Sequence, residues 1–158
     1  MSHLSKNNRK KLLIVFHSQS GTSAGLAQAV LAGAAAQGQI AVTVLRASDA
    51  EAADFIACDM VVVIAAENIG RLSGGMRNFF DRVFYPCEDK VAGKPYALIV
   101  AAGNDGSGAD RELQQIFSGL GMVHALPTEI CKGRLSDQEN AYSEWANMLA
   151  EGLAMGIF

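Results

Sequence analysis

The chain has 158 residues, of which half are hydrophobic and 18% are charged. This balance is typical of a single globular domain with a full core, and the formal net charge of −3 argues against nucleic acid as a main partner. No apolar run approaches the roughly 18 residues that span a bilayer. The polar start of the chain also lacks the apolar core of a secretory signal. We therefore predict a cytoplasmic protein with no membrane partner.

The start of the chain differs in charge from the rest. Lys6, Arg9, Lys10 and Lys11 are four of the 13 basic residues, and no acidic residue lies among them. We predict a flexible basic tail over residues 1–10 and a single domain over residues 11–158. The three cysteines and three histidines have no metal-site spacing, so we expect no metal ion and reduced thiols.

Strand and helix patterns alternate along the whole chain. Continuous apolar runs indicate central strands covered on both faces, mixed runs indicate edge strands, and apolar residues at three- and four-residue spacing indicate helices. Ser48-x-x-Glu51 and Ser136-x-x-Glu139 have the spacing of capping boxes at helix starts. In chain order we predict a strand at 12–16, a helix over 26–34, a strand at 40–45, a strand at 60–65, a helix over 76–84, a strand at 97–102, a helix over 113–120, a strand at 122–126 and a helix over 142–149.

The first predicted strand runs into a short polar loop, Ser18-Gln19-Ser20-Gly21-Thr22-Ser23, and a helical pattern follows at once. Backbone N–H groups and the helix dipole converge on an anion at such a junction, and the Ser and Thr hydroxyls add donors. The loop has no Lys or Arg, and it matches neither GxxxxGK[ST] nor GxGxxG. We predict that it holds a single phosphate with neutral donors.

The second polar loop follows the strand at 60–65 and contains Glu67-Asn68-Ile69-Gly70-Arg71. Its glycine allows close backbone approach to a flat ligand, and Glu67 and Asn68 could read the hydrogen-bonding edge of a ring. Arg71 either stabilises negative charge on a reduced ring or on a nicotinamide phosphate, or is a surface residue. The sequence leaves both interpretations open.

The third polar loop follows the strand at 97–102 and reads Gly103-Asn104-Asp105-Gly106-Ser107-Gly108. Its three glycines permit positive φ and leave backbone N–H groups unobstructed. Such a loop can wrap the edge of a planar heterocycle. Because ligands of open α/β sheets bind at the carboxyl ends of the strands, we expect the three loops to form one site. A neutral phosphate cradle beside two glycine-rich walls suits a mononucleotide with a flat head group, and FMN fits best.

These motifs resemble the flavodoxin-like family. Residues 18–23 are similar to its phosphate loop, [ST]-x-[ST]-G-x-[ST], and residues 67–82 and 102–109 look like the flavin loops of small NAD(P)H-dependent FMN oxidoreductases. The resemblance implies a three-layer, doubly wound α/β fold with a five-stranded parallel sheet in the order 2-1-3-4-5 and FMN over its carboxyl edge. In place of the Gly-[ST]-Pro that is usual before the second loop, this chain has Ile64-Ala65-Ala66.

The function implied by the resemblance is an oxidoreductase that passes electrons from NAD(P)H through FMN to a small acceptor such as a quinone or a flavin. The cofactor carries that chemistry, so no side chain is assigned a catalytic role. Two alternatives stay open. One is a flavodoxin-type electron carrier between protein partners, and the other is a flavin-free binding protein of the same fold. The phenylalanine-rich helix over 76–84 either packs its aromatic side chains in the core or forms the contact of a homodimer.

Overall fold

The computed structural model of the protein describes residues 8–158, so residues 1–7 of the expected basic tail lie outside the described residues. The strands are β1 (Lys11–Phe16), β2 (Ala41–Arg46), β3 (Met60–Asn68), β4 (Arg71–Leu72), β5 (Pro95–Ala101), β6 (Val123–His124) and β7 (Glu129–Cys131). The helices are α1 (Thr22–Ala35), α2 (Ala52–Ala57), α3 (Gly74–Cys87), α4 (Ser107–Gly119) and α5 (Glu139–Ala154), with a 3₁₀ turn η2 (Leu135–Asp137). Among the helices of residues 8–158, none is long and apolar enough to cross a membrane.

The sheet has the strand order β2-β1-β3-β5-β6, and every pair along this path is parallel. β7 follows β6 in the chain and, like β6, pairs in parallel with β5. The two short strands are therefore two pieces of one edge strand. Counted in this way, the parallel strands follow the order 2-1-3-4-5, and the predicted flavodoxin-like fold is confirmed. β4 is an addition that pairs antiparallel with the end of β3.

The edge strand is interrupted where the sequence predicts one strand at 122–126. The Ala125 N–H still donates to the Tyr96 carbonyl oxygen at 2.9 Å, and parallel pairing resumes at Glu129. Pro127 lies between them and has no N–H to donate to the ladder. The proline therefore divides the strand, and its second half reaches the carboxyl edge of the sheet as β7.

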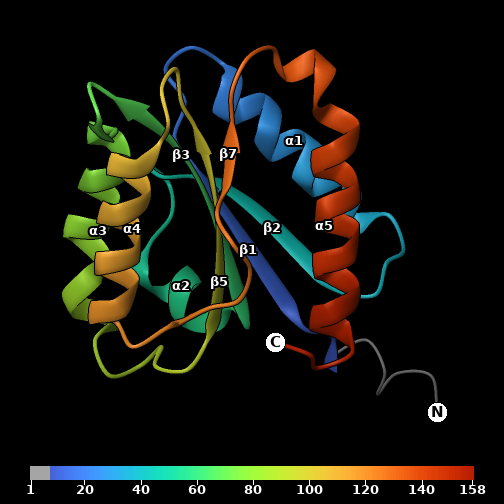
Figure 1. The fold of residues 1–158 in the computed structure, drawn as a ribbon. Coiled ribbons are helices and arrows are strands. Elements are labelled where there is room, and N and C mark those ends of the chain that lie inside the picture. The colour runs from blue at the N-terminus through green and yellow to red at the C-terminus, as the bar shows by residue number, and fades with distance from the viewer. Residues whose placement is uncertain (1–7) are drawn as a thin grey trace.

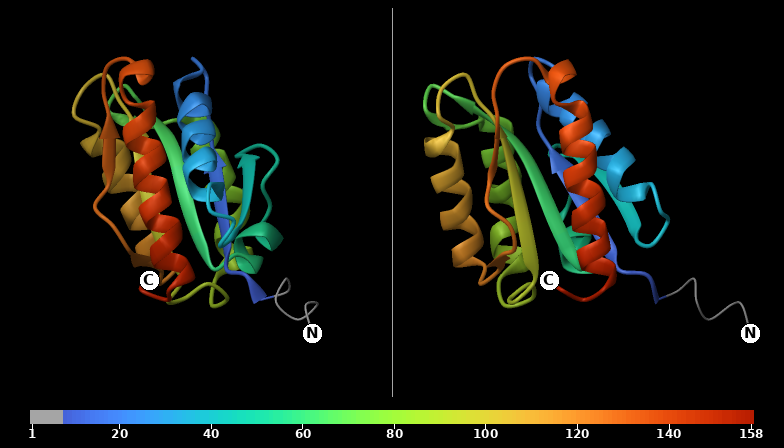
Figure 2. Two further views of the ribbon diagram at one scale, coloured as in Figure 1. Left: turned by 90° about the vertical axis from the view of Figure 1, so that its right-hand side faces the viewer. Right: turned by 45° about the vertical axis from the view of Figure 1, so that its right-hand side comes forward.

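Helices cover both faces of the sheet, as Figures 1 and 2 show, with α1 and α5 side by side on one face and α2, α3 and α4 on the other. Successive side chains of a strand point to opposite faces, so each central strand feeds both cores. On β1, Leu13 and Val15 pack with the cluster under α2–α4, whereas Leu12, Ile14 and Phe16 pack with the cluster under α1 and α5. Burial on both faces accounts for the unbroken apolar runs in the sequence.

Both expected capping boxes are wrong. The Asp49 and Ala50 N–H groups donate to the Arg46 carbonyl oxygen, which closes a turn around Ser48 before α2 begins. At the start of α2, the Asp54 carboxylate instead accepts the N–H of the N-cap residue, Glu51, at 2.9 Å. Ser136 similarly lies inside η2, and α5 begins one turn later, after Gln138.

Candidate functional site

The three polar loops meet at one edge of the sheet. β1, β3 and β5 are parallel neighbours, so their carboxyl ends lie side by side, at the upper edge of the sheet in Figure 1. A pocket of about 360 Å³ opens at this edge. Its lining comprises Ser18, Gln19, Ser20, Thr22 and Ser23 from the first loop, Ala66, Glu67 and Asn68 from the second, Ala101, Ala102 and Gly103 from the third, and Cys131 and Gly133 from the end of β7.

The first loop is shaped around Gly21, the N-cap of α1. Gly21 has φ of +94°, which a side chain would strain, and its N–H donates to Ser18 Oγ at 2.9 Å. No side chain caps the helix, so the N–H groups at the start of α1 remain available to a ligand. The hydroxyls of Ser18, Ser20 and Thr22 line the same space. The loop is thus a neutral anion cradle at the positive end of a helix.

The second loop is a β-hairpin. β3 continues to Asn68, Ile69 and Gly70 make the turn with φ of +54° and +72°, and β4 returns along β3. Positive φ at both turn residues is the geometry of a tight two-residue hairpin turn. The Asn68 side-chain amide donates to Gln19 Oε1 at 3.3 Å, which ties the hairpin to the phosphate loop.

Glu67 joins the hairpin to the third loop. Its Oε2 accepts the N–H groups of Gly108 at 3.0 Å and Ala109 at 3.2 Å, at the start of α4, whose N-cap residue Gly106 has no side chain of its own to cap the helix. The negative charge is stabilised there by the helix dipole. A Cβ at Gly108 would overlap the carbonyl oxygen of Gly70, so the hairpin also packs directly on α4. One carboxylate oxygen of Glu67 therefore holds two walls of the pocket together.

The third loop turns at Gly106, which has φ of +73° and precedes α4. Asp105 Oδ1 accepts the backbone N–H of Ser107 at 3.0 Å and its hydroxyl at 2.9 Å. These hydrogen bonds hold the pKa of the Asp105 carboxyl below its usual value. The carboxylate therefore stabilises the loop, while Gly103, which has open space where a Cβ would lie, lines the pocket.

Half of the predicted site residues line the pocket, and the others lie around it. The glycines at 21, 70, 106 and 108 shape the backbone, Asn104 and Asp105 are exposed on the third loop, Ile69 is the fully exposed tip of the hairpin, and Arg71 is exposed on β4. The sequence interpretation missed Ala66, Ala101, Ala102, Cys131 and Gly133. Cys131 and Gly133 could have been found, because they lie at and just beyond the carboxyl end of the fifth parallel strand and so belong to the same edge.

A larger pocket, of about 920 Å³, lies elsewhere, along α5, where residues of β7 on one side and of the end of α1 on the other also line it. None of the three loops contributes to it. We place the candidate functional site at the smaller pocket because the loops, a helix N-terminus and the carboxyl ends of the central strands converge there.

A sequence model of the family described as NADPH-dependent FMN reductase matches residues 49–132, which is more than half of the chain. The chain belongs to this family. The matched segment of this FMN reductase family member includes the second and third loops and begins after the phosphate loop. A search of curated proteins found no match.

Solved structures similar to this family member share its fold. A flavodoxin from the domain Archaea has 19% identity and a TM-score of 0.76, covering 90% of this chain and 98% of that one. A WrbA-like flavodoxin from Agrobacterium tumefaciens has 16% identity and a TM-score of 0.70, with coverage of 92% and 98%. The flavodiiron core of a Synechocystis protein has 17% identity and a TM-score of 0.77, covering 96% of this chain but 38% of the other. This reductase family member thus has a flavodoxin-like fold.

The residues at the pocket fit FMN. The first loop offers hydroxyls and free helix N–H groups to a phosphate, and Gly103 leaves room for the edge of a flat ring. The cradle contains no Lys or Arg, which suits one phosphate better than the higher charge of a triphosphate. Within residues 8–158, no group of His, Cys, Asp and Glu side chains is arranged to hold a metal ion.

Proposed function

We propose that this protein reduces a small acceptor, such as a quinone or a flavin, with electrons that NAD(P)H delivers through FMN bound at the carboxyl-edge pocket. The observation that carries the proposal is the convergence of all three loops on one pocket. The family match supports FMN as the cofactor. When bound, FMN supplies hydride acceptance and electron transfer.

The protein's own part is to bind and orient. The start of α1 and the hydroxyls of Ser18, Ser20 and Thr22 hold the phosphate, with Gly21 shaping the loop and Gln19 and Ser23 completing the wall. Asn68, Ile69 and Gly70 form one wall beside the ring. Gly103 and the loop of Asn104, Asp105 and Gly106 form the other, and Glu67 and Gly108 fix the distance between the two walls.

Arg71 is assigned to the nicotinamide nucleotide. Its side chain is exposed on β4, outside the lining of the FMN pocket, so it is better placed to meet an incoming anion than to hold FMN. A surface guanidinium attracts phosphate groups and pairs with them bidentately. We therefore expect Arg71→Ala to raise the KM for the nicotinamide nucleotide without changing the affinity for FMN.

The test is an anaerobic reduction of the FMN-loaded protein. NADH or NADPH should bleach the yellow flavin band within seconds, and the electrons should then pass to a quinone. A flavin that NADH and NADPH leave oxidised, but that dithionite takes to a stable one-electron-reduced state, would identify an electron carrier instead. A protein that binds no FMN would be the flavin-free alternative.

A further inference from the structure

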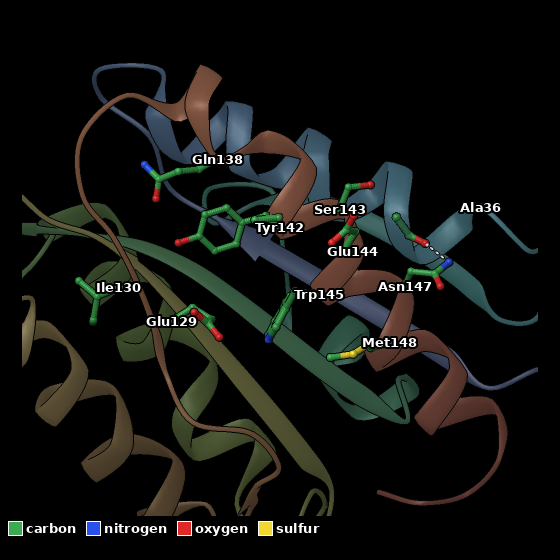
Figure 3. Close-up of a pocket in the computed structure, with 12 residues that line it drawn as sticks. Ala36, Glu129, Ile130, Gln138, Tyr142, Ser143, Glu144, Trp145, Asn147 and Met148 are labelled. Atoms are coloured by element: carbon green, nitrogen blue, oxygen red, sulfur yellow. Dashed lines mark hydrogen bonds between the residues drawn. The ribbon is translucent and has the colours of Figure 1, made fainter.

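A second cavity lies on the side of the molecule covered by α5. The larger pocket, which we call the α5–β7 groove, has a volume of about 920 Å³ and is separate from the three loops. Figure 3 shows Glu129 of β7 on the same side as Tyr142 and Trp145 of α5, with Met148 one turn further along the helix, whereas the neighbouring Ile130 side chain packs toward the core under α2–α4. Its size falls in the range of small-molecule sites.

The α5 wall is aromatic and polarisable. Trp145 is half-buried, with its indole at the groove, and Tyr142 is buried beside it. Met148 is 64% exposed, although a methionine side chain is ordinarily packed inside. The faces of indole and phenol rings attract cations. The flexible thioether side chain of methionine can pack against the apolar part of a ligand.

The charged side chains that line the groove are all acidic. Glu129 and Glu144 contribute to its lining, and no Lys or Arg does. Across residues 8–158, Arg77 and Glu112 form the one ion pair, so neither Glu129 nor Glu144 has a basic partner in that part of the chain. The Glu129 charge is also one of the causes that raise the pKa of the Tyr142 phenol, after burial and the Cys131 thiol.

We propose that the α5–β7 groove binds a small organic cation with an apolar or aromatic body, the cationic centre lying between Glu129 and Trp145. Carboxylates beside an indole face are the chemistry that recognises a quaternary ammonium group. A second copy of this chain docked across a two-fold axis would instead bring the acidic linings toward each other. The charge pattern thus favours a cationic ligand over a homodimer at this face.

The groove is distinct from the FMN pocket but shares a wall with it. Cys131 lines the FMN pocket and Gln138 lines the groove, and Cys131 Sγ lies 3.8 Å from Gln138 Oε1. The site therefore does not depend on the proposed function, and it can be tested with the cofactor bound.

The experiment is a titration of the FMN-saturated protein with benzyltrimethylammonium, followed by calorimetry and by tryptophan fluorescence. Trp145 is the only tryptophan in the chain, so all tryptophan emission comes from a residue that lines the groove, and a constant FMN occupancy keeps quenching by the flavin unchanged. We expect saturable binding with a Kd of about 1 mM or lower, a change in Trp145 emission, and no binding of phenylacetate, the anionic counterpart with the same ring.

Two variants and a control complete the design. Glu129→Gln and Trp145→Leu should each weaken binding about two- to fivefold. Glu88→Gln removes one negative charge from an exposed position at the end of α3 and should leave binding unchanged. A far-ultraviolet circular dichroism spectrum matching that of wild type shows that each variant is folded, and Glu129→Gln keeps the proposal falsifiable if Trp145→Leu does not fold. Equal binding of phenylacetate, no saturation by the cation, or full affinity in Glu129→Gln would each overturn the proposal.

Discussion

Gly108 is a position where the absence of a side chain fixes the distance between two walls of the FMN pocket. A Cβ there would overlap the Gly70 carbonyl oxygen, and because that atom is backbone, the whole hairpin must move. We expect Gly108→Ala to cost about 1–3 kcal/mol of unfolding free energy in urea denaturation. It should also weaken FMN binding several-fold.

Gly74, in the first turn of α3, is the matched control. It is also a helical glycine, but nothing lies within 4 Å of where its Cβ would be. Gly74→Ala should be neutral or stabilising by up to about 1 kcal/mol, as alanine is in helices. Equal destabilisation by the two substitutions would contradict the packing described for the hairpin.

Cys58 makes stability depend on pH in the alkaline range. Burial raises the pKa of its thiol from 9.0 to about 11. The folded state therefore keeps its proton after the unfolded chain has lost it, so this contribution is complete below pH 9 and is lost as the pH rises toward 11. Wild type should lose roughly 2 kcal/mol more than Cys58→Ala across that window, measured by urea denaturation. Parallel pH profiles for the two proteins would contradict a buried neutral thiol.

The contact of Glu67 with the start of α4 joins the hairpin to the third loop. Glu67→Ala leaves the Gly108 and Ala109 N–H groups without their acceptor and removes a favourable charge from a helix N-terminus. We expect a loss of about 1–2 kcal/mol in unfolding free energy and faster hydrogen exchange at residues 67–72 and 103–109. Glu88→Ala, at the exposed end of α3, should stay within about 0.5 kcal/mol of wild type. An exchange pattern unaffected by Glu67→Ala would show that the hairpin is held by other contacts.

The sequence predicts best those elements that have a long continuous run or repeat of apolar residues. The strands β1, β3 and β5 are apolar almost throughout because both their faces are buried, and such continuous runs are typical of central parallel strands. β4 is missed because two residues are too short for any period. Its turn is missed because Ile69, a β-branched residue, occupies a positive φ that sequence patterns assign to Gly, Asn or Asp.

The site could be predicted as a set of loops but not as a set of contacts. Parallel strands bring their carboxyl ends together whatever their side chains are, so chain order alone indicates that residues 18–23, 67–71 and 103–108 approach one another. Which way a side chain points depends on the helix beside it. Glu67 was expected to read a ligand edge, and its contact with Gly108 depends on the position of α4, which the sequence does not specify.

The core under α2–α4 is centred on packed aromatic rings. The centroid of the Phe117 ring lies 3.9 Å from the ring centroid of Tyr96, 5.5 Å from that of Phe80 and 6.1 Å from that of Phe55. The Phe117 side chain is fully buried. Phe117→Ala should cost about 3–5 kcal/mol of unfolding free energy. Tyr85→Ala removes an aromatic ring that is 76% exposed and should change stability by less than about 0.5 kcal/mol. Comparable losses in the two variants would contradict this description of the core.

We propose that the neutral cradle at the start of α1 binds the phosphate of FMN. The most direct measurement compares the equilibrium affinities of the protein for FMN and for riboflavin, which differ only in that phosphate. Because charge-assisted hydrogen bonds contribute about 1.5–3 kcal/mol each, FMN should bind at least about tenfold more tightly. Equal affinity for the two flavins, or binding of neither, would contradict the account.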